Sequence, residues 1–149
     1  MTQEGISDTV AVNLIAPLHL TQAFSKKLIE NNLAGCIVNI SSTSSRKATP
    51  GRTAYCATKA AINQMTRSSA FELGPHKIRV NAVNPTFVMT DLVKKTTSAE
   101  FVESRRKLMP LGALPLIEDV VAAVKFLLSD DARMVTGQCL AVDSGILTS

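Results

Sequence analysis

The sequence is poor in the residues that build metal sites and disulfide frameworks. Its three cysteines, Cys36, Cys56 and Cys139, are odd in number and far apart. That pattern fits neither a disulfide framework nor a zinc site. The two histidines, His19 and His76, have no partner residues at the spacing of metal ligands. We therefore expect no metal in this protein.

Strong charge and long apolar runs are missing as well. Sixteen basic and twelve acidic residues leave a net charge of +4, and the basic residues fall in short clusters that solvated helix faces explain. No stretch is long enough to span a membrane, and the N-terminus lacks the pattern of a signal peptide. We expect a cytoplasmic protein that binds no nucleic acid. With 149 residues, 46% of them hydrophobic, the chain can bury a single core without disulfides.

Glycine is absent from the positions where a nucleotide site needs it. The seven glycines are never closer together than eight residues. The chain therefore has no G-x-G-x-x-G turn, which lets backbone amides approach a pyrophosphate at a helix N-terminus. The acidic or basic residue that chooses between NAD and NADP after such a turn is missing with it.

Helical and β-type patterns alternate along the chain, with apolar residues at helical spacing between near-continuous apolar runs. This alternation predicts an α/β fold with a doubly wound, Rossmann-like parallel sheet covered on both faces. Ligands of such sheets bind beyond the carboxyl ends of the strands, so we expect functional loops after the first two strands. The expected helices cover about 7–32, with a kink at Pro17, 53–73, 99–107 and 116–128, and the expected strands cover 36–42, 78–84 and 138–143.

Tyr55 and Lys59 lie four residues apart, and Ser42 lies thirteen residues before the tyrosine. Positions i and i+4 share one face of a helix, so the lysine ammonium is expected near the phenol, where it favours phenolate. A phenol tuned in this way is suited to donate a proton during carbonyl reduction. A lone Tyr-x-x-x-Lys pair also occurs as an ordinary surface pair, and the motifs around it decide between the two interpretations.

Those motifs follow one order, with matching gaps, over essentially the whole chain. They are Val12-Asn13-Leu14, Ile37-Val-Asn-Ile-Ser-Ser42, Tyr55-Cys-Ala-Thr-Lys59, Glu72-Leu-Gly74, Ile78-Arg-Val-Asn-Ala-Val-Asn-Pro85, Phe126-Leu-Leu-Ser-Asp130 and Thr136-Gly137. Together they resemble the short-chain dehydrogenases/reductases, and residues 72–90 are most similar to the L-xylulose (dicarbonyl) reductases and related tetrameric carbonyl reductases.

The resemblance implies four catalytic residues. By this resemblance, Tyr55 protonates the carbonyl oxygen and Lys59 supports the tyrosine and binds the nicotinamide ribose. Ser42 hydrogen-bonds the substrate oxygen and stabilises its developing charge. Asn13 matches a helical asparagine that holds a water linking the lysine to solvent; the alternative is a polar residue that merely interrupts a helix. Rivals to Ser42 are Ser41, Ser44 and Ser45, and the thirteen-residue spacing from Tyr55 favours Ser42.

The resemblance also implies NADPH as the cofactor. The positions expected along the nicotinamide, besides Tyr55 and Lys59, are Pro85, Thr86, Val88 and Thr90. Loops 43–52 and 91–107 would shape substrate access. Because the glycine turn is absent, we expect residues 1–149 to be the C-terminal part of a single domain. The missing N-terminal mononucleotide half would comprise about 90 residues, or three βαβ units.

The expected activity is reduction of a sugar ketone such as xylulose, or of a dicarbonyl, by a homotetramer in carbohydrate metabolism. Two alternatives stay open. The substrate could belong to another class, such as 3-oxoacyl thioesters or hydroxysteroids. The chain could also be a truncated, non-catalytic isoform or fragment that acts only by association with full-length subunits. In that case its first strand would present a bare apolar edge, a feature that recruits other chains.

Overall fold

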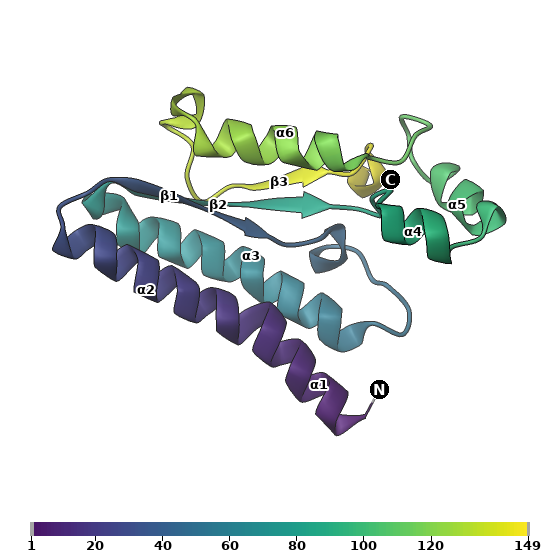
Figure 1. The fold of residues 1–149 in the computed structure, drawn as a ribbon, viewed down its shortest axis with the longest axis horizontal. Coiled ribbons are helices and arrows are strands. Elements are labelled where there is room, and N and C mark those ends of the chain that lie inside the picture. Colours follow the sequence, from purple (N-terminus) through teal and green to yellow (C-terminus); the bar gives the residue numbers. More distant parts are fainter. Residues whose placement is uncertain (1, 149) are drawn as a thin grey trace.

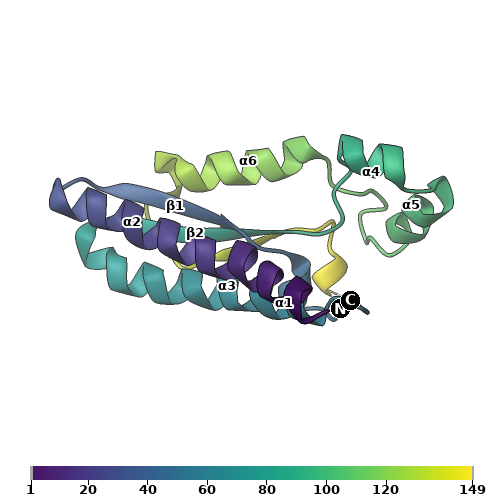
Figure 2. The same cartoon turned by 60° about the horizontal axis from the view of Figure 1, so that its bottom comes forward.

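The computed structural model describes residues 2–148 as a three-stranded parallel sheet with helices on both faces (Figures 1 and 2). Helices α2 and α3 lie on one side of the sheet and α6 on the other. The expected doubly wound α/β architecture is confirmed. The helices and strands are α1 (Gln3–Val10), α2 (Ala16–Glu30), β1 (Gly35–Ile40), α3 (Thr53–Leu73), β2 (Ile78–Pro85), α4 (Asp91–Thr96), α5 (Ala99–Arg106), α6 (Ile117–Leu128) and β3 (Cys139–Val142).

The strands run in the order β1-β2-β3, so β2 is central and β1 has an outer edge that pairs with no other strand of residues 2–148. Ile40 pairs in register with Val83, and the N–H of Ser41 donates to the Val83 carbonyl at 2.8 Å. In a parallel ladder this directs the N–H and C=O of Ile40 away from β2. The carbonyl of Ile40 therefore faces the open edge.

The core lies around β2 because this strand is covered on both faces. Its Val80, Ala82 and Val83 are fully buried. Ala70 of α3 packs with Ile78 and Val80, and partly buried side chains of α2, β1 and α3 close the cluster: Leu28, Ile29, Ile37 and Leu73. Burial of such side chains, worth about 1.5–3 kcal/mol each, holds α2 and α3 against the sheet.

The expected helix over residues 7–32 is interrupted. A π-helical turn, Ala11–Ile15, separates α1 from α2, and Pro17 stands at the start of α2. Proline has no N–H, so the carbonyl of Asn13, four residues earlier, loses its regular helical donor. The irregularity expected at Pro17 thus extends upstream as a change of helix type. Single π-turns of this kind are frequent at functional sites.

Two further details differ from the sequence-based expectation. Helix α3 stops at Leu73 as predicted, but Gly74 keeps a right-handed conformation and Lys77 is the left-handed residue, with φ of 58°. The segment after β2 holds two helices rather than one, because Thr90 caps α4 by accepting the Val93 N–H. A Thr-Asp pair before an apolar residue is a start signal for a helix.

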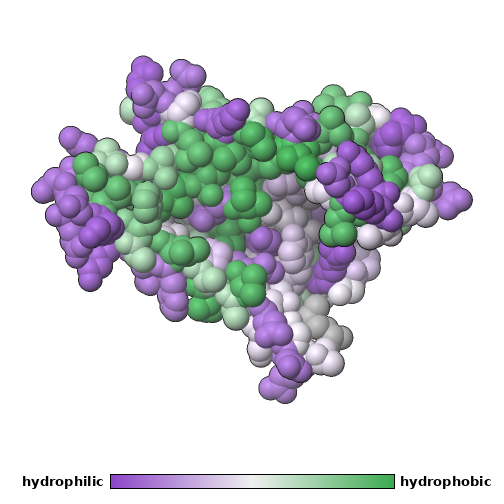
Figure 3. All heavy atoms as spheres, viewed as in Figure 1, coloured by the Kyte–Doolittle hydropathy of each residue, from purple (hydrophilic) through white to green (hydrophobic). Residues whose placement is uncertain are grey.

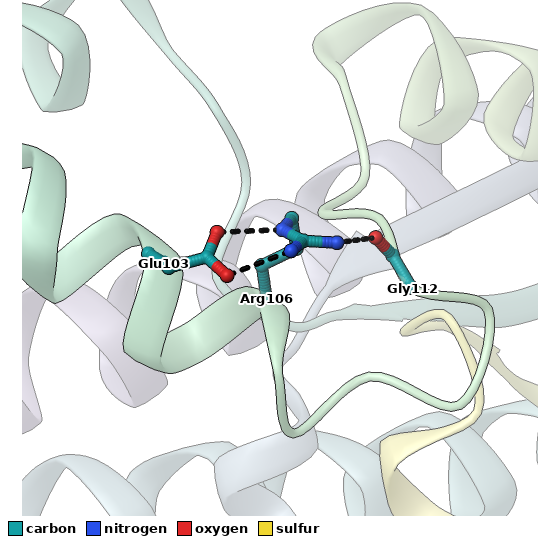
Figure 4. A network of polar contacts seen from close by, with 3 residues as sticks. All are labelled: Glu103, Arg106 and Gly112. Carbon is teal, nitrogen blue, oxygen red and sulfur yellow. Dashed lines mark hydrogen bonds and ion pairs between the residues drawn. The ribbon is translucent and has the colours of Figure 1, made fainter.

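Helix α5 is tied to the loop that follows it (Figure 4). The Arg106 guanidinium binds both oxygens of Glu103 at 2.7 Å, and its Nη1 donates to the Gly112 carbonyl at 2.9 Å. The hydrogen bond from Arg106 holds the pKa of the Glu103 carboxyl below its usual range. Over residues 2–148, no helix is both long enough and apolar enough to cross a membrane.

Candidate active site

Tyr55 and Lys59 lie in the first turns of α3, one helical turn apart. Both are half-buried, and the Lys59 ammonium nitrogen is 5.7 Å from the centre of the Tyr55 ring. The predicted shared face is therefore confirmed. Lys59 Nζ also donates to the Ile40 carbonyl at 2.9 Å, the carbonyl that faces the open edge of β1. Burial lowers the pKa of Lys59, because the charged form loses hydration.

Ser42 lies two residues beyond β1, at the rim where both β1 and β2 end. It begins a 3₁₀ turn, Thr43–Ser45, and its Oγ accepts the Ser44 N–H at 3.1 Å. The turn packs against α3, the helix that carries Tyr55 and Lys59. The Ser42 hydroxyl donates to no group among residues 2–148, so its hydrogen is available for a ligand oxygen.

Ser41, next to Ser42, links the end of β1 to helix α3. Ser41 Oγ donates to the Lys59 carbonyl at 2.9 Å, linking the end of β1 to α3. Thr58 Oγ1 donates to the Tyr55 carbonyl at 2.8 Å within the same helix. The backbone around Tyr55 and Lys59 is thus held from the strand side. Rigid support of this kind is what a site with fixed geometry requires.

Asn13 is placed in the π-helical turn, and this turn packs against α3. Its side chain is half-buried. The proline four residues later removes the regular α-helical donor of the Asn13 carbonyl. The sequence-based expectation that Asn13 holds a water linking Lys59 to solvent stays a prediction.

The segment from Pro85 to Thr90 leaves β2 at the same rim and is pinned at both ends. The Thr86 N–H donates to Val142 of β3 at 3.2 Å, and the Met89 N–H donates to Pro115 at 3.0 Å. Val88 and Thr90 are half-buried. Thr90 Oγ1 accepts the Val93 N–H at 3.2 Å and donates to no group among residues 2–148, so its proton is available to a ligand.

A hollow of about 510 Å³ lies away from these residues, between α2 and the outer side of β1. Its lining is mainly apolar and includes Leu20, Phe24 and Ile40, which are 69%, 48% and 51% exposed. Figure 3 shows a band of apolar atoms crossing this face of the molecule. The bare apolar edge expected for the first strand is therefore present.

The structure also adds three polar residues that the sequence did not single out as functional. Ser45, Asn63 of α3 and Asn84 of β2 meet beneath the Ser42 turn. In the sequence, Ser45 is only a rival to Ser42, and Asn84 is only one residue of the Ile78–Pro85 motif. Asn63 carries no signal there, and the contact among the three depends on how α3 crosses β2. Among residues 2–148, no group of histidines, cysteines and carboxylates could hold a metal ion.

The fold, the Tyr55–Lys59 pair and the Ser42 turn together define a class of protein. A family model described as enoyl-(acyl carrier protein) reductase matches residues 1–147. The chain belongs to the short-chain dehydrogenase/reductase family.

The relatives include the L-xylulose and carbonyl reductases that residues 72–90 resemble. It is 42% identical to D-erythrulose reductase of Gallus gallus over 100% of this chain, and 42% identical to L-xylulose reductase of Homo sapiens over 97%. It is 40% identical to carbonyl reductase [NADPH] 2 of Sus scrofa over 99% of the chain. These matches cover 61%, 60% and 61% of the respective relatives.

Solved structures agree with the fold. A 4-hydroxyisoleucine dehydrogenase complexed with NADH superposes with a TM-score of 0.95 at 32% identity. The match covers 99% of this chain and 61% of that one. The chain thus spans about six tenths of the length of the relatives and of this structure.

Proposed function

We propose that the protein containing these residues reduces the carbonyl of a small sugar ketone or dicarbonyl with hydride from NADPH. The observation that carries the proposal is the Lys59 ammonium held 5.7 Å from the Tyr55 ring, on the helix that packs against the Ser42 turn. A proton donor, a nearby cation and a hydroxyl at one sheet rim are the parts that carbonyl reduction needs.

The residues fit the nicotinamide end of a dinucleotide. The free proton of Thr90 Oγ1 and the pinned backbone from Pro85 to Val88 offer a rigid surface at the carboxyl ends of the strands, where such ligands bind. Lys59 would hold the ribose. The sequence contains no closely spaced glycines, so no pyrophosphate contact is assigned to these residues.

Each catalytic residue has a defined role in this proposal. When bound, NADPH supplies the hydride that reduces the carbonyl carbon. Tyr55 donates the proton to the carbonyl oxygen, and the Lys59 ammonium stabilises the phenolate that this leaves. Ser42 donates a hydrogen bond to the same oxygen as negative charge develops on it. Asn13 holds a water that connects Lys59 with solvent.

The substrate class is argued from the named relatives, which reduce erythrulose and xylulose or carry the name carbonyl reductase. We therefore place a short ketose or dicarbonyl first, with the activity in carbohydrate metabolism. Reductases of 3-oxoacyl thioesters are the alternative, supported by a solved 3-oxoacyl-[acyl-carrier protein] reductase at 32% identity. Homotetramer formation and a cytoplasmic location complete the proposal and rest on the family resemblance.

A second candidate function is association without catalysis. The open edge of β1 and the adjoining apolar hollow favour it, since an unpaired edge beside exposed Leu20 and Phe24 recruits another chain. In this case residues 1–149 would act by joining full-length subunits and would turn over no substrate.

Steady-state assays separate the two candidates. The longest encoded polypeptide that contains this chain is mixed with NADPH and, in turn, L-xylulose, erythrulose, a small dicarbonyl and a 3-oxoacyl thioester, and NADPH absorbance is followed. We expect kcat/KM for a ketose or the dicarbonyl to exceed that for the thioester. Turnover of none of the four would contradict the proposal and favour association.

A further inference from the structure

A hub of hydrogen bonds lies beneath the turn that carries Ser42. Ser45 Oγ donates to the Ser42 carbonyl at 2.6 Å. The same oxygen accepts Asn63 Nδ2 of α3 at 2.7 Å and Asn84 Nδ2 of β2 at 3.2 Å. One hydroxyl thus joins the Ser42 turn to a helix and to the central strand.

The hydroxyl of Ser45 is saturated by these contacts. A serine hydroxyl has one hydrogen and two acceptor sites. Its hydrogen goes to Ser42, so both neighbouring amides have to donate through their nitrogens, as they do. The Ser45 N–H adds a second bond to the same Ser42 carbonyl at 3.0 Å. The turn is therefore fixed in one orientation by its own hydrogen bonds and by contacts from α3 and β2.

The two asparagines are unfavourable for the stability of the fold at these positions. Asn63 and Asn84 are only 4% and 0% exposed, and neither Oδ1 atom has a hydrogen-bond partner among residues 2–148. A buried acceptor without a donor costs stability, and apolar side chains of similar size would avoid that cost. Their amide nitrogens, by contrast, are both aimed at Ser45.

We propose that Ser45, Asn63 and Asn84 are positioning residues that hold the Ser42 hydroxyl in its catalytic orientation. The kinetic consequence of this inference rests on the proposed function. Its structural consequence rests on the hydrogen-bond geometry alone. Asn63 and Asn84 act through Ser45, and Ser45 acts through the Ser42 carbonyl. None of the three is assigned a contact with the substrate.

The structural half is tested by amide hydrogen exchange, which needs no activity. The Ser44 and Ser45 N–H groups both bond to Ser42, so their exchange rates report the turn. Ser45→Ala and Asn84→Ala are each expected to speed exchange at these two amides by more than tenfold. Unchanged exchange in both variants would overturn the proposal.

Asn81→Ala is the matched control. Asn81 is a fully buried asparagine on the same strand, but its side chain bonds to Val135 and Gln138, away from the turn. Its loss should lower stability without changing exchange at Ser44 and Ser45 or kcat. A change at these amides equal to that of Asn84→Ala would show a general loosening and contradict the proposal.

The kinetic half is a double-mutant cycle in the longest encoded polypeptide. Ser45→Ala alone should lower kcat by about tenfold to 10²-fold, the usual effect of misplacing a catalytic group, with KM little changed. In a Ser42→Ala background the same substitution should lower kcat by less than about twofold, since the group it positions is gone. Ser45→Thr, which keeps the hydroxyl, should restore most of the loss.

The outcomes distinguish this inference from the proposed function. If the parent polypeptide turns over no substrate, the proposed function fails and the exchange rates alone decide whether the three residues hold the turn. If the parent is active and the Ser45→Ala loss is equally large in both backgrounds, the residues act by general stability and the positioning role is wrong.

Discussion

At the scale of the single residue, the half-buried ammonium group of Lys59 contacts both an aromatic ring and a backbone carbonyl. Its ammonium is near the Tyr55 ring and bonds to the Ile40 carbonyl, which faces an open strand edge. Burial lowers the pKa of this lysine, because its charged form loses hydration. Its position beside the Tyr55 ring supports the functional role proposed for it.

Two substitutions separate the roles of the charged and the hydroxyl groups. Lys59→Ala is expected to lower turnover and also to weaken NADPH binding, because the same ammonium supports Tyr55 and holds the ribose. Ser42→Ala should lower kcat by about 10²–10³, the effect of losing one donor to a developing oxyanion, and leave NADPH affinity intact. Steady-state rates and NADPH titration measure both. Equal effects of the two variants on NADPH affinity would contradict this division.

The sequence predicted the residues of the site whose spacing lies within one element or one motif. Tyr55 and Lys59 were placed by the helical repeat, and Ser42 by its thirteen-residue spacing and the end of a strand. The role of Asn63 and Asn84 was not predicted, because they contact Ser45 only through the tertiary packing of α3 on β2. No local pattern encodes such a crossing.

At the scale of the element, boundaries with strong chemical signals were predicted well. Helix α3 has its predicted bounds, because Gly74-Pro75 is unfavourable within an α-helix and ends it. Helix α4 was missed because it has only 6 residues and little apolar periodicity, so only the Thr90 cap marks it. The π-turn was anticipated only as a kink at Pro17, because the proline marks an irregularity in the sequence but not the change of helix type that precedes it.

The contact between α2 and the start of β1 gives a stability prediction. A methyl group added at Gly35 would collide with Leu28, which packs against the core cluster. Gly35→Ala is expected to lower the free energy of unfolding by about 1–2 kcal/mol, as in other overpacked sites.

Gly74→Ala is the matched control for that variant. Gly74 has a right-handed helical conformation, and a methyl group there meets no atom within 4 Å. This substitution should raise stability by about 0.4–1 kcal/mol through the unfolded state. Urea unfolding of the two variants measures both changes. The same sign for both would show that the collision at Gly35 is relieved by a movement of Leu28.

At the scale of the whole molecule, the residues that perform the proposed chemistry and those that would grip a dinucleotide are separate. The described chain has a complete Ser42–Tyr55–Lys59 arrangement, an open β1 edge and no closely spaced glycines. We therefore expect residues 1–149 alone to bind NADPH only weakly, because nothing in them cradles the pyrophosphate. Calorimetric titration checks this, and micromolar affinity would contradict it.

The central claim is that Tyr55 is the proton donor of a carbonyl reductase. Tyr55→Phe removes only the phenol hydroxyl, so in the longest encoded polypeptide it tests that claim most directly when turnover and NADPH affinity are measured side by side. The account predicts that ketose or dicarbonyl reduction is lost while NADPH binds nearly as in the parent. Retention of more than about a tenth of the parent kcat, far above what loss of a general acid leaves, would show that another group donates the proton.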